Sequence, residues 1–193
     1  MARRNSLKRI PCVLCLCLPL LGRTILAQAE ISDIQWNVLE TKHTIVHYQS
    51  SSDLRKLNQK VDFSPGSWGL KGLFAKPSPH ELHSQTKNTL DALYERVQEI
   101  LDMRKRMKPV VIRIYGTKKQ LHAAYDNVYG KPCQLRAWYI YESNTISVTV
   151  EDLHEGILAH EMAHAVIDHY LLVRPPPATT EILARYVDSH LFD

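Results

Sequence analysis

Three consecutive prolines at positions 175–177 separate two helix-forming segments near the carboxyl end of the chain. Proline has no amide hydrogen and a fixed φ, so these residues must stop the first helix and stiffen the connection that follows it. Apolar residues recur at helical spacing over residues 152–172, and Asp152 with Glu155 forms a capping box at the start. The second helix is predicted over about residues 180–190. We therefore expect two antiparallel helices joined by a stiff connection.

The first of these helices contains the sequence His160-Glu161-Met162-Ala163-His164, a pattern typical of zinc peptidases. Two imidazoles at i and i+4 project from one helical face about 6 Å apart. Both can therefore bind one tetrahedral zinc ion at about 2.0–2.1 Å. Glu161 lies beside them, where its carboxylate can act as a general base on a zinc-activated water. The alternative is a helix with two surface histidines.

A catalytic zinc needs a third protein ligand, for which Glu181 is the favoured candidate. The helix rises about 12 Å from His164 to residue 172. The connection 173–179 is long enough to bring the chain back to the level of the metal. A cap at Thr179 or Thr180 would then place Glu181 in the first turn of the second helix. The alternative is an ordinary first-turn glutamate, stabilised by the helix dipole.

Two aspartates are weaker candidates for a role near the metal. Asp168 shares the face of the two histidines but is short and one turn further along, so a supporting or surface role is expected. Asp188 lies seven residues after Glu181, on the same helical face, where it could orient a ligand histidine from behind. The alternative for Asp188 is a solvated helix residue.

The remainder of the chain mixes helical and strand periodicities, which predicts an α+β fold in one domain over residues 30–193. Ser78 and Glu81 form a capping box for a long amphipathic helix that is expected to reach about Arg106. Residues 50–76 show no clean apolar period and are expected to form a long ordered loop. The other predicted elements are strands at 44–48 and 110–115, a helix at 117–128 and a β-hairpin formed by 135–141 and 145–150.

The basic excess of the chain lies at its amino end. The 193 residues include 24 Lys and Arg against 20 Asp and Glu, and residues 1–29 hold five of the basic residues and no acid. A short apolar run from Ile10 to Leu21 follows the first four basic residues, and the small residues of Ala27-Gln28-Ala29 come after it. This order is typical of a signal peptide cleaved near Ala29. The run is too short for a stable membrane span. The remaining chain is near neutral, so nucleic-acid binding is not expected.

Residues 156–166, the prolines at 175–177 and residues 180–187 together resemble the minimal peptidase MA-like domains of the gluzincin metallopeptidases, which are distant relatives of thermolysin. In that family the glutamate of the second helix is the third zinc ligand, and it matches Glu181. The resemblance implies a zincin-like domain with a small mixed sheet ending in a hairpin, a long amino-terminal helix, an active-site helix and a carboxyl-terminal ligand helix.

By the same resemblance, Ala137, Trp138 and Tyr139 lie on the edge strand that pairs with an extended peptide substrate. An exposed strand edge is physically suited to that task, because its backbone groups can pair with a peptide. The alternative is that Trp138 and Tyr139 only pack the sheet.

These observations favour an exported zinc metallopeptidase, periplasmic or secreted, that acts on a peptide or protein with Glu161 as general base. One alternative is a catalytically inactive zinc-binding domain of zincin-like fold that binds a peptide or an envelope partner. Another is an exported protein without a metal, in which the motif occurs by chance.

Overall fold

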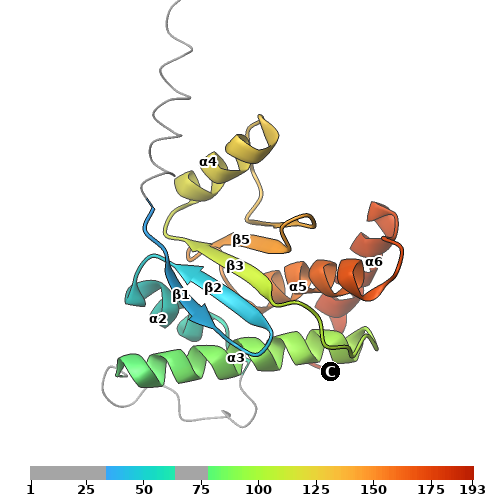
Figure 1. Cartoon of the computed structure of the whole chain (residues 1–193), viewed down its shortest axis with the longest axis horizontal. Coiled ribbons are helices and arrows are strands. Elements are labelled where there is room, and N and C mark those ends of the chain that lie inside the picture. The colour runs from blue at the N-terminus through green and yellow to red at the C-terminus, as the bar shows by residue number, and fades with distance from the viewer. Residues whose placement is uncertain (1–33, 64–77) are drawn as a thin grey trace, which may run out of the picture.

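The computed structural model describes residues 34–63 and 78–193, which form five helices and one five-stranded mixed sheet (Figure 1). The predicted α+β fold class is therefore confirmed. The expected signal peptide at residues 1–29 lies outside the described residues, as does most of the expected loop after residue 63. Within the described ranges, every helix is too short or too polar to cross a membrane.

The sheet has the strand order β1-β2-β3-β5-β4. The three central strands are parallel to one another, and each edge strand is antiparallel to its neighbour. The predicted hairpin is confirmed and places β4 at one edge of the sheet, whereas β1, at the other edge, was not predicted. The strands are β1 (Asn37–Glu40), β2 (Thr44–Tyr48), β3 (Val110–Tyr115), β4 (Ala137–Ile140) and β5 (Thr145–Thr149).

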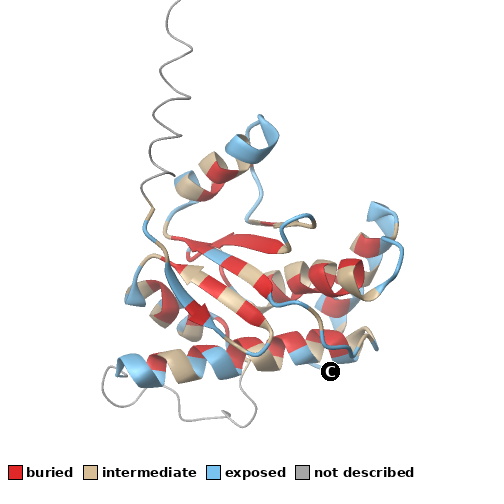
Figure 2. Cartoon of the chain, in the orientation of Figure 1, coloured by how far each residue is buried: buried red, intermediate tan, exposed pale blue. Residues whose placement is uncertain are grey.

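Helices cover both faces of the sheet. The larger core includes residues of α3 (Pro79–Ile100) and α5 (Glu155–Tyr170), whereas α4 (Lys118–Tyr129) packs over a smaller cluster that includes Trp138. Figure 2 shows β5 buried along its length, as expected for a strand covered on both faces. Gly130 adopts a left-handed φ of 63° and ends α4, a backbone conformation that glycine adopts without strain.

The segment after β2 is a helix, α2 (Ser51–Lys60), so the expectation of a loop across residues 50–76 was wrong here. Asp53 forms a capping box with Ser50, and its carboxylate accepts the Ser50 amide at 2.7 Å. Leu54 and Leu57 are completely buried, and they are the only leucines on an otherwise polar helix. So few apolar residues leave a weak periodic signal in the sequence, although they suffice to anchor the helix.

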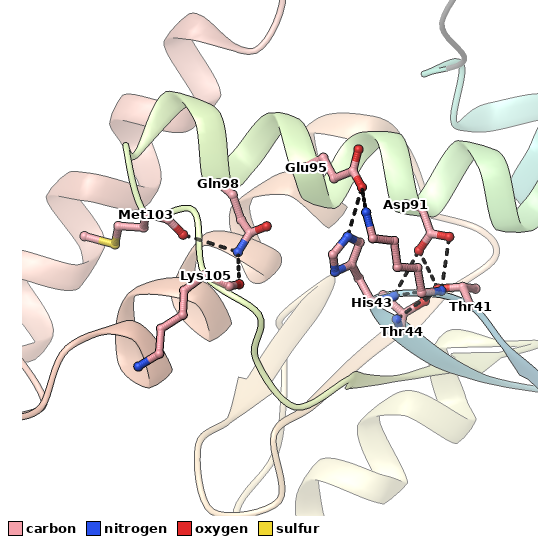
Figure 3. Close-up of polar contacts among 9 residues, drawn as sticks. Thr41, His43, Thr44, Asp91, Glu95, Gln98, Met103 and Lys105 are labelled. Carbon is pink, nitrogen blue, oxygen red and sulfur yellow. Dashed lines mark hydrogen bonds and ion pairs between the residues drawn. The ribbon is translucent and has the colours of Figure 1, made fainter.

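Helix α3 begins at the predicted capping box, with Ser78 accepting the Glu81 amide, but it ends at Ile100 rather than near Arg106. Asp102 turns the chain with a φ of 52°. The Gln98 amide then donates to the carbonyls of Met103 and Lys105, at 3.2 and 2.8 Å (Figure 3). A side chain thus satisfies two carbonyls of the turn that follows the helix, and α3 ends about six residues before the predicted end.

Asp91 joins the middle of α3 to the turn between β1 and β2 (Figure 3). Its carboxylate accepts the Thr41 hydroxyl at 2.6 Å and the backbone amides of Lys42 and His43 at 3.1 Å each. These contacts fix the edge of the sheet on the helix that also packs against α5.

Candidate metal centre

Helix α5 carries both motif histidines and is largely a core helix. It begins at Glu155, where His154 Nδ1 accepts the Ile157 amide at 3.3 Å. The predicted cap at Asp152 was therefore wrong. The Asp152 carboxylate instead forms an ion pair with Lys118 at 3.0 Å. The helix ends at Tyr170, before residue 172, so the predicted end was too late by two residues.

The apolar residues between the motif positions point into the core. Leu158, Met162 and Val166 are completely buried, whereas His160 and His164 keep 23% and 20% of their side chains exposed. The helical period therefore directs the apolar face inward and leaves both imidazoles at the surface of the core, open to a ligand.

The second helix, α6 (Pro177–His190), starts earlier than predicted. Pro176 is its N-cap and Pro177 its first residue, because proline has no amide to leave unpaired there. Neither Thr179 nor Thr180 is the cap, so Glu181 lies in the second turn rather than the first. The early start still brings Glu181 alongside the motif.

Three side chains from these two helices converge. His160 Nε2 and His164 Nε2 are 3.3 Å apart, and Glu181 Oε2 lies 3.7 Å from the first and 3.6 Å from the second. Among the described residues, this is the one group of three or more histidine, cysteine or acidic side chains whose geometry could hold a metal ion.

The spacing of the three atoms is close to that of a tetrahedral site. Ligand atoms about 2.0–2.1 Å from a tetrahedral ion lie about 3.3–3.4 Å from one another. The distance between the two histidines equals this value, and the two distances to Glu181 exceed it by a few tenths of an ångström. Small side-chain movements would close the difference.

Charged residues bind two of the three side chains through the atoms that do not face the cluster. Asp188 Oδ2 lies 2.9 Å from His160 Nδ1, so the imidazole can donate Nδ1–H to it and leave the Nε2 lone pair free. Arg185 Nε donates to Glu181 Oε1 at 2.8 Å, which leaves Oε2 toward the histidines. Of the two alternatives for Asp188 that the sequence left open, the 2.9 Å contact favours a side chain that orients His160 over a solvated helix residue.

Asp168, the weaker candidate from the sequence, lies outside the cluster. Its side chain is 2% exposed and accepts Arg174 Nε at 3.0 Å and Nη2 at 2.9 Å. The Arg174 guanidinium also lies 4.4 Å from the ring centre of Tyr141, which stacks on His169. Asp168 therefore fixes the connection between α5 and α6, and the expectation of a surface position was wrong.

Burial and charge shift the pKa values of the site in different directions. Burial raises the pKa of Glu161 to about 7, and the neighbouring Glu181 and Asp188 carboxylates add to the rise while His160 opposes it. Burial lowers the pKa of His164, an effect that His160 reinforces. The hydrogen bond from Arg185 lowers the pKa of Glu181, so that this carboxylate is ionised at neutral pH.

A pocket of about 420 Å³ opens beside the cluster. Its wall includes His160, Glu161 and Asp188, together with residues from the first turn of α5 and from the start of β4. Ala137 lines it, whereas Trp138 is buried against Tyr125 and Tyr129 under α4. The packing alternative thus describes Trp138.

Tyr139 also has a structural contact. Its hydroxyl donates to Asn144 Oδ1 at 3.2 Å, across the hairpin from β4 to the turn, and the side chain packs against the larger core. The edge of β4 that faces away from β5 has no neighbouring strand among the described residues.

Sequence reasoning missed four residues of the pocket wall, Arg136, His154, Gly156 and Ile157. Gly156 and Ile157 lie in the stretch 156–166 that carries the resemblance, but no role in a site was expected for them. Arg136 is separated from the motif helix by the whole hairpin. Only the fold brings them together. The His154 cap was hidden by the stronger capping pattern at Asp152.

Comparisons with protein families, with curated proteins and with solved structures give no match to this chain. The basis for a function is therefore the chemistry of the side chains in the cluster and in the pocket wall.

Proposed function

We propose that this chain is an exported zinc-dependent metallopeptidase. The observation that carries the proposal is the convergence of His160 Nε2, His164 Nε2 and Glu181 Oε2 within 3.3 to 3.7 Å, beside a pocket that Glu161 also lines. Export is part of the proposal because of the basic and apolar pattern of residues 1–29.

The donor set suits zinc. Two imidazole nitrogens and one carboxylate oxygen make up the ligands of many catalytic zinc sites, which keep a fourth position open. The open pocket lies where such a position needs access. Zinc bound there would supply Lewis acidity, lowering the pKa of a water and polarising a carbonyl.

The remaining residues supply orientation and proton transfer. Asp188 holds the His160 ring so that Nε2 faces the cluster, and Arg185 orients the Glu181 carboxylate. Glu161 faces the pocket without a ligand role and would take a proton from the attacking water, then pass it to the leaving amine.

The substrate proposed for this site is a peptide in extended form. One end of β4 lines the pocket, and β4 is an edge strand, so a peptide could add to the sheet and extend past the cluster. The competing function is an inactive zinc-binding domain that uses the same groove. Glu161 favours the enzyme, because a binding domain has no need of a carboxylate at this position.

The test combines zinc analysis with peptide hydrolysis for the protein and two variants. We expect Glu161→Gln to retain zinc and to lose hydrolysis by at least about 100-fold, since it removes the proton acceptor. Glu155→Gln, which removes a carboxylate from the first turn of the same helix, is the matched control and should behave like the wild type.

Three results separate the competing functions. Zinc with no hydrolysis in any variant would favour the inactive binding domain. Absence of zinc from the wild type would leave only the chance occurrence of the motif. Hydrolysis by Glu161→Gln at the wild-type rate would remove Glu161 from the mechanism.

A further inference from the structure

The wall of the pocket beside the cluster combines two chemically different groups of residues. One group is Glu161, Asp188 and His160, and Asp188 is already paired with His160. The other group is Arg136, which is the last residue before β4, and His154, which caps α5. Both side chains are exposed and border the same cavity.

Arg136 has no acidic partner in the described part of the chain. Most other arginines near this region are engaged: Arg174 pairs with Asp168, and Arg185 with Glu181. A guanidinium has a fixed planar array of donors that matches a carboxylate, which makes it well suited to recognise one. Arg136 therefore brings an uncompensated positive charge to the pocket wall.

His154 adds a hydrogen-bond donor to the same pocket wall. Its Nδ1 accepts the Ile157 amide at 3.3 Å, so the neutral ring carries its hydrogen on Nε2. This Nε2–H can donate to an acceptor. The α5 amino terminus, where His154 lies, also favours negative charge through the helix dipole.

The remaining residues of the wall are apolar or small. They are Ala137, Gly156 and Ile157, and a Cβ on Gly156 would lie 3.2 Å from the His154 ring. His154 and His160 are six residues apart on α5 or its cap, which corresponds to about 9 Å along the helix axis. An extended peptide covers that distance in about three residues.

We propose that Arg136, assisted by His154, binds a carboxylate of the peptide substrate within three residues of the cleaved bond. The carboxylate is either an acidic side chain or the carboxyl terminus of the peptide. The inference rests on the proposed function for the identity of the ligand, and it adds the class of substrate: acidic peptides or peptides cut close to their free carboxyl end.

A binding experiment tests this without requiring turnover. The Glu161→Gln protein is titrated by calorimetry with unlabelled, end-blocked and otherwise neutral hexapeptides in which Glu or Gln occupies each position in turn, and with pairs that end in a free carboxyl group or an amide. We expect the Glu or free-acid member of at least one pair to bind about 3- to 10-fold more tightly, as for a partly exposed charged pair. Which pair responds identifies the source of the carboxylate.

The preference is then measured in Arg136 variants of the same protein. Arg136→Gln should bring the ratio close to one, and Arg136→Lys should keep part of it. Arg106→Gln removes the same charge from an exposed position outside the pocket and should leave the ratio unchanged. A preference that persists in Arg136→Gln overturns the inference, as does equal binding, or no binding, by both members of every pair.

Peptide hydrolysis by the protein with Glu161 intact is measured as well, and it distinguishes this inference from the proposed function. An Arg136-dependent binding preference without hydrolysis would sustain the carboxylate site and overturn the peptidase. Hydrolysis without any acid preference would sustain the peptidase and overturn the carboxylate site.

Discussion

The two helices that supply the clustered side chains are held in the fold in different ways. Helix α5 has eight of its 16 residues buried, whereas α6 has three buried residues out of 14. The histidines therefore project from a helix that the core fixes along its length. Glu181 projects from a helix whose apolar contact with the rest of the molecule is small.

Charged contacts at both ends compensate for the small apolar contact of α6. Before it, Arg174 binds Asp168 of α5 and fixes the connection. At its carboxyl end, Arg96 of α3 donates to the main-chain carbonyls of His190, Leu191 and Asp193, at 2.9 to 3.3 Å. Apolar packing therefore positions the two histidines, whereas ion pairs and helix capping position Glu181.

The largest expected effect is on stability, and it separates a buried apolar residue of α5 from an exposed one of α6. Leu158→Ala in α5 should lower the free energy of unfolding by about 2–5 kcal/mol, because it leaves a cavity at a fully buried position. Ile182→Ala in α6, at a position 67% exposed, should change it by less than about 0.5 kcal/mol. Urea denaturation of both variants measures the difference, and equal losses would contradict the comparison.

The ion pair before α6 gives the next largest effect. Arg174→Met should lower the free energy of unfolding by about 1–3 kcal/mol, because it leaves the buried Asp168 carboxylate without its donors. Arg104→Met breaks an exposed pair with Glu99 and should cost less than about 1 kcal/mol.

The zinc affinity of Arg174→Met shows whether the position of α6 depends on this ion pair. Arg174 contacts none of the three clustered side chains, so any loss of zinc affinity in Arg174→Met must come from a displaced α6. Competition with a chelator measures it, with Arg104→Met as control. Unchanged affinity would show that α6 does not need this anchor.

A smaller effect is expected from the aspartate behind His160. Asp188→Asn keeps the shape but weakens the acceptor at His160 Nδ1, and should reduce zinc affinity about 10- to 100-fold. Asp193→Asn, an exposed aspartate after the same helix, is the matched control. If both variants bind zinc like the wild type, Asp188 is a solvated residue with no role in the site.

The elements that could be predicted from the sequence are those with a dense apolar period. Leu90, Leu93 and Val97 in α3, and Leu158, Met162 and Val166 in α5, repeat every three or four residues, so both helices were expected. Helix α2 was missed because only Leu54 and Leu57 of its ten residues carry that signal.

For the site, the spacing of residues along each helix indicated which side chains share a face. His160 and His164 are one helical turn apart on α5, and Glu181 and Asp188 are two turns apart on α6. Contacts that depend on the packing of distant segments could not be predicted in this way. The pairing of Asp168 with Arg174 and the place of Arg136 depend on how the connection and the hairpin pack, which no local pattern encodes. The metal and the reaction are proposals that the geometry supports.

The most direct test of the account is the zinc content of Glu181→Ala, because this residue alone joins α6 to the two histidines of α5. The wild type and Glu155→Gln should each bind one zinc per chain after chelation and reloading. Glu181→Ala should bind zinc more than about 100-fold more weakly, since it removes a charged ligand and leaves two imidazoles. Zinc bound by Glu181→Ala with wild-type stoichiometry and affinity would contradict the three-ligand site.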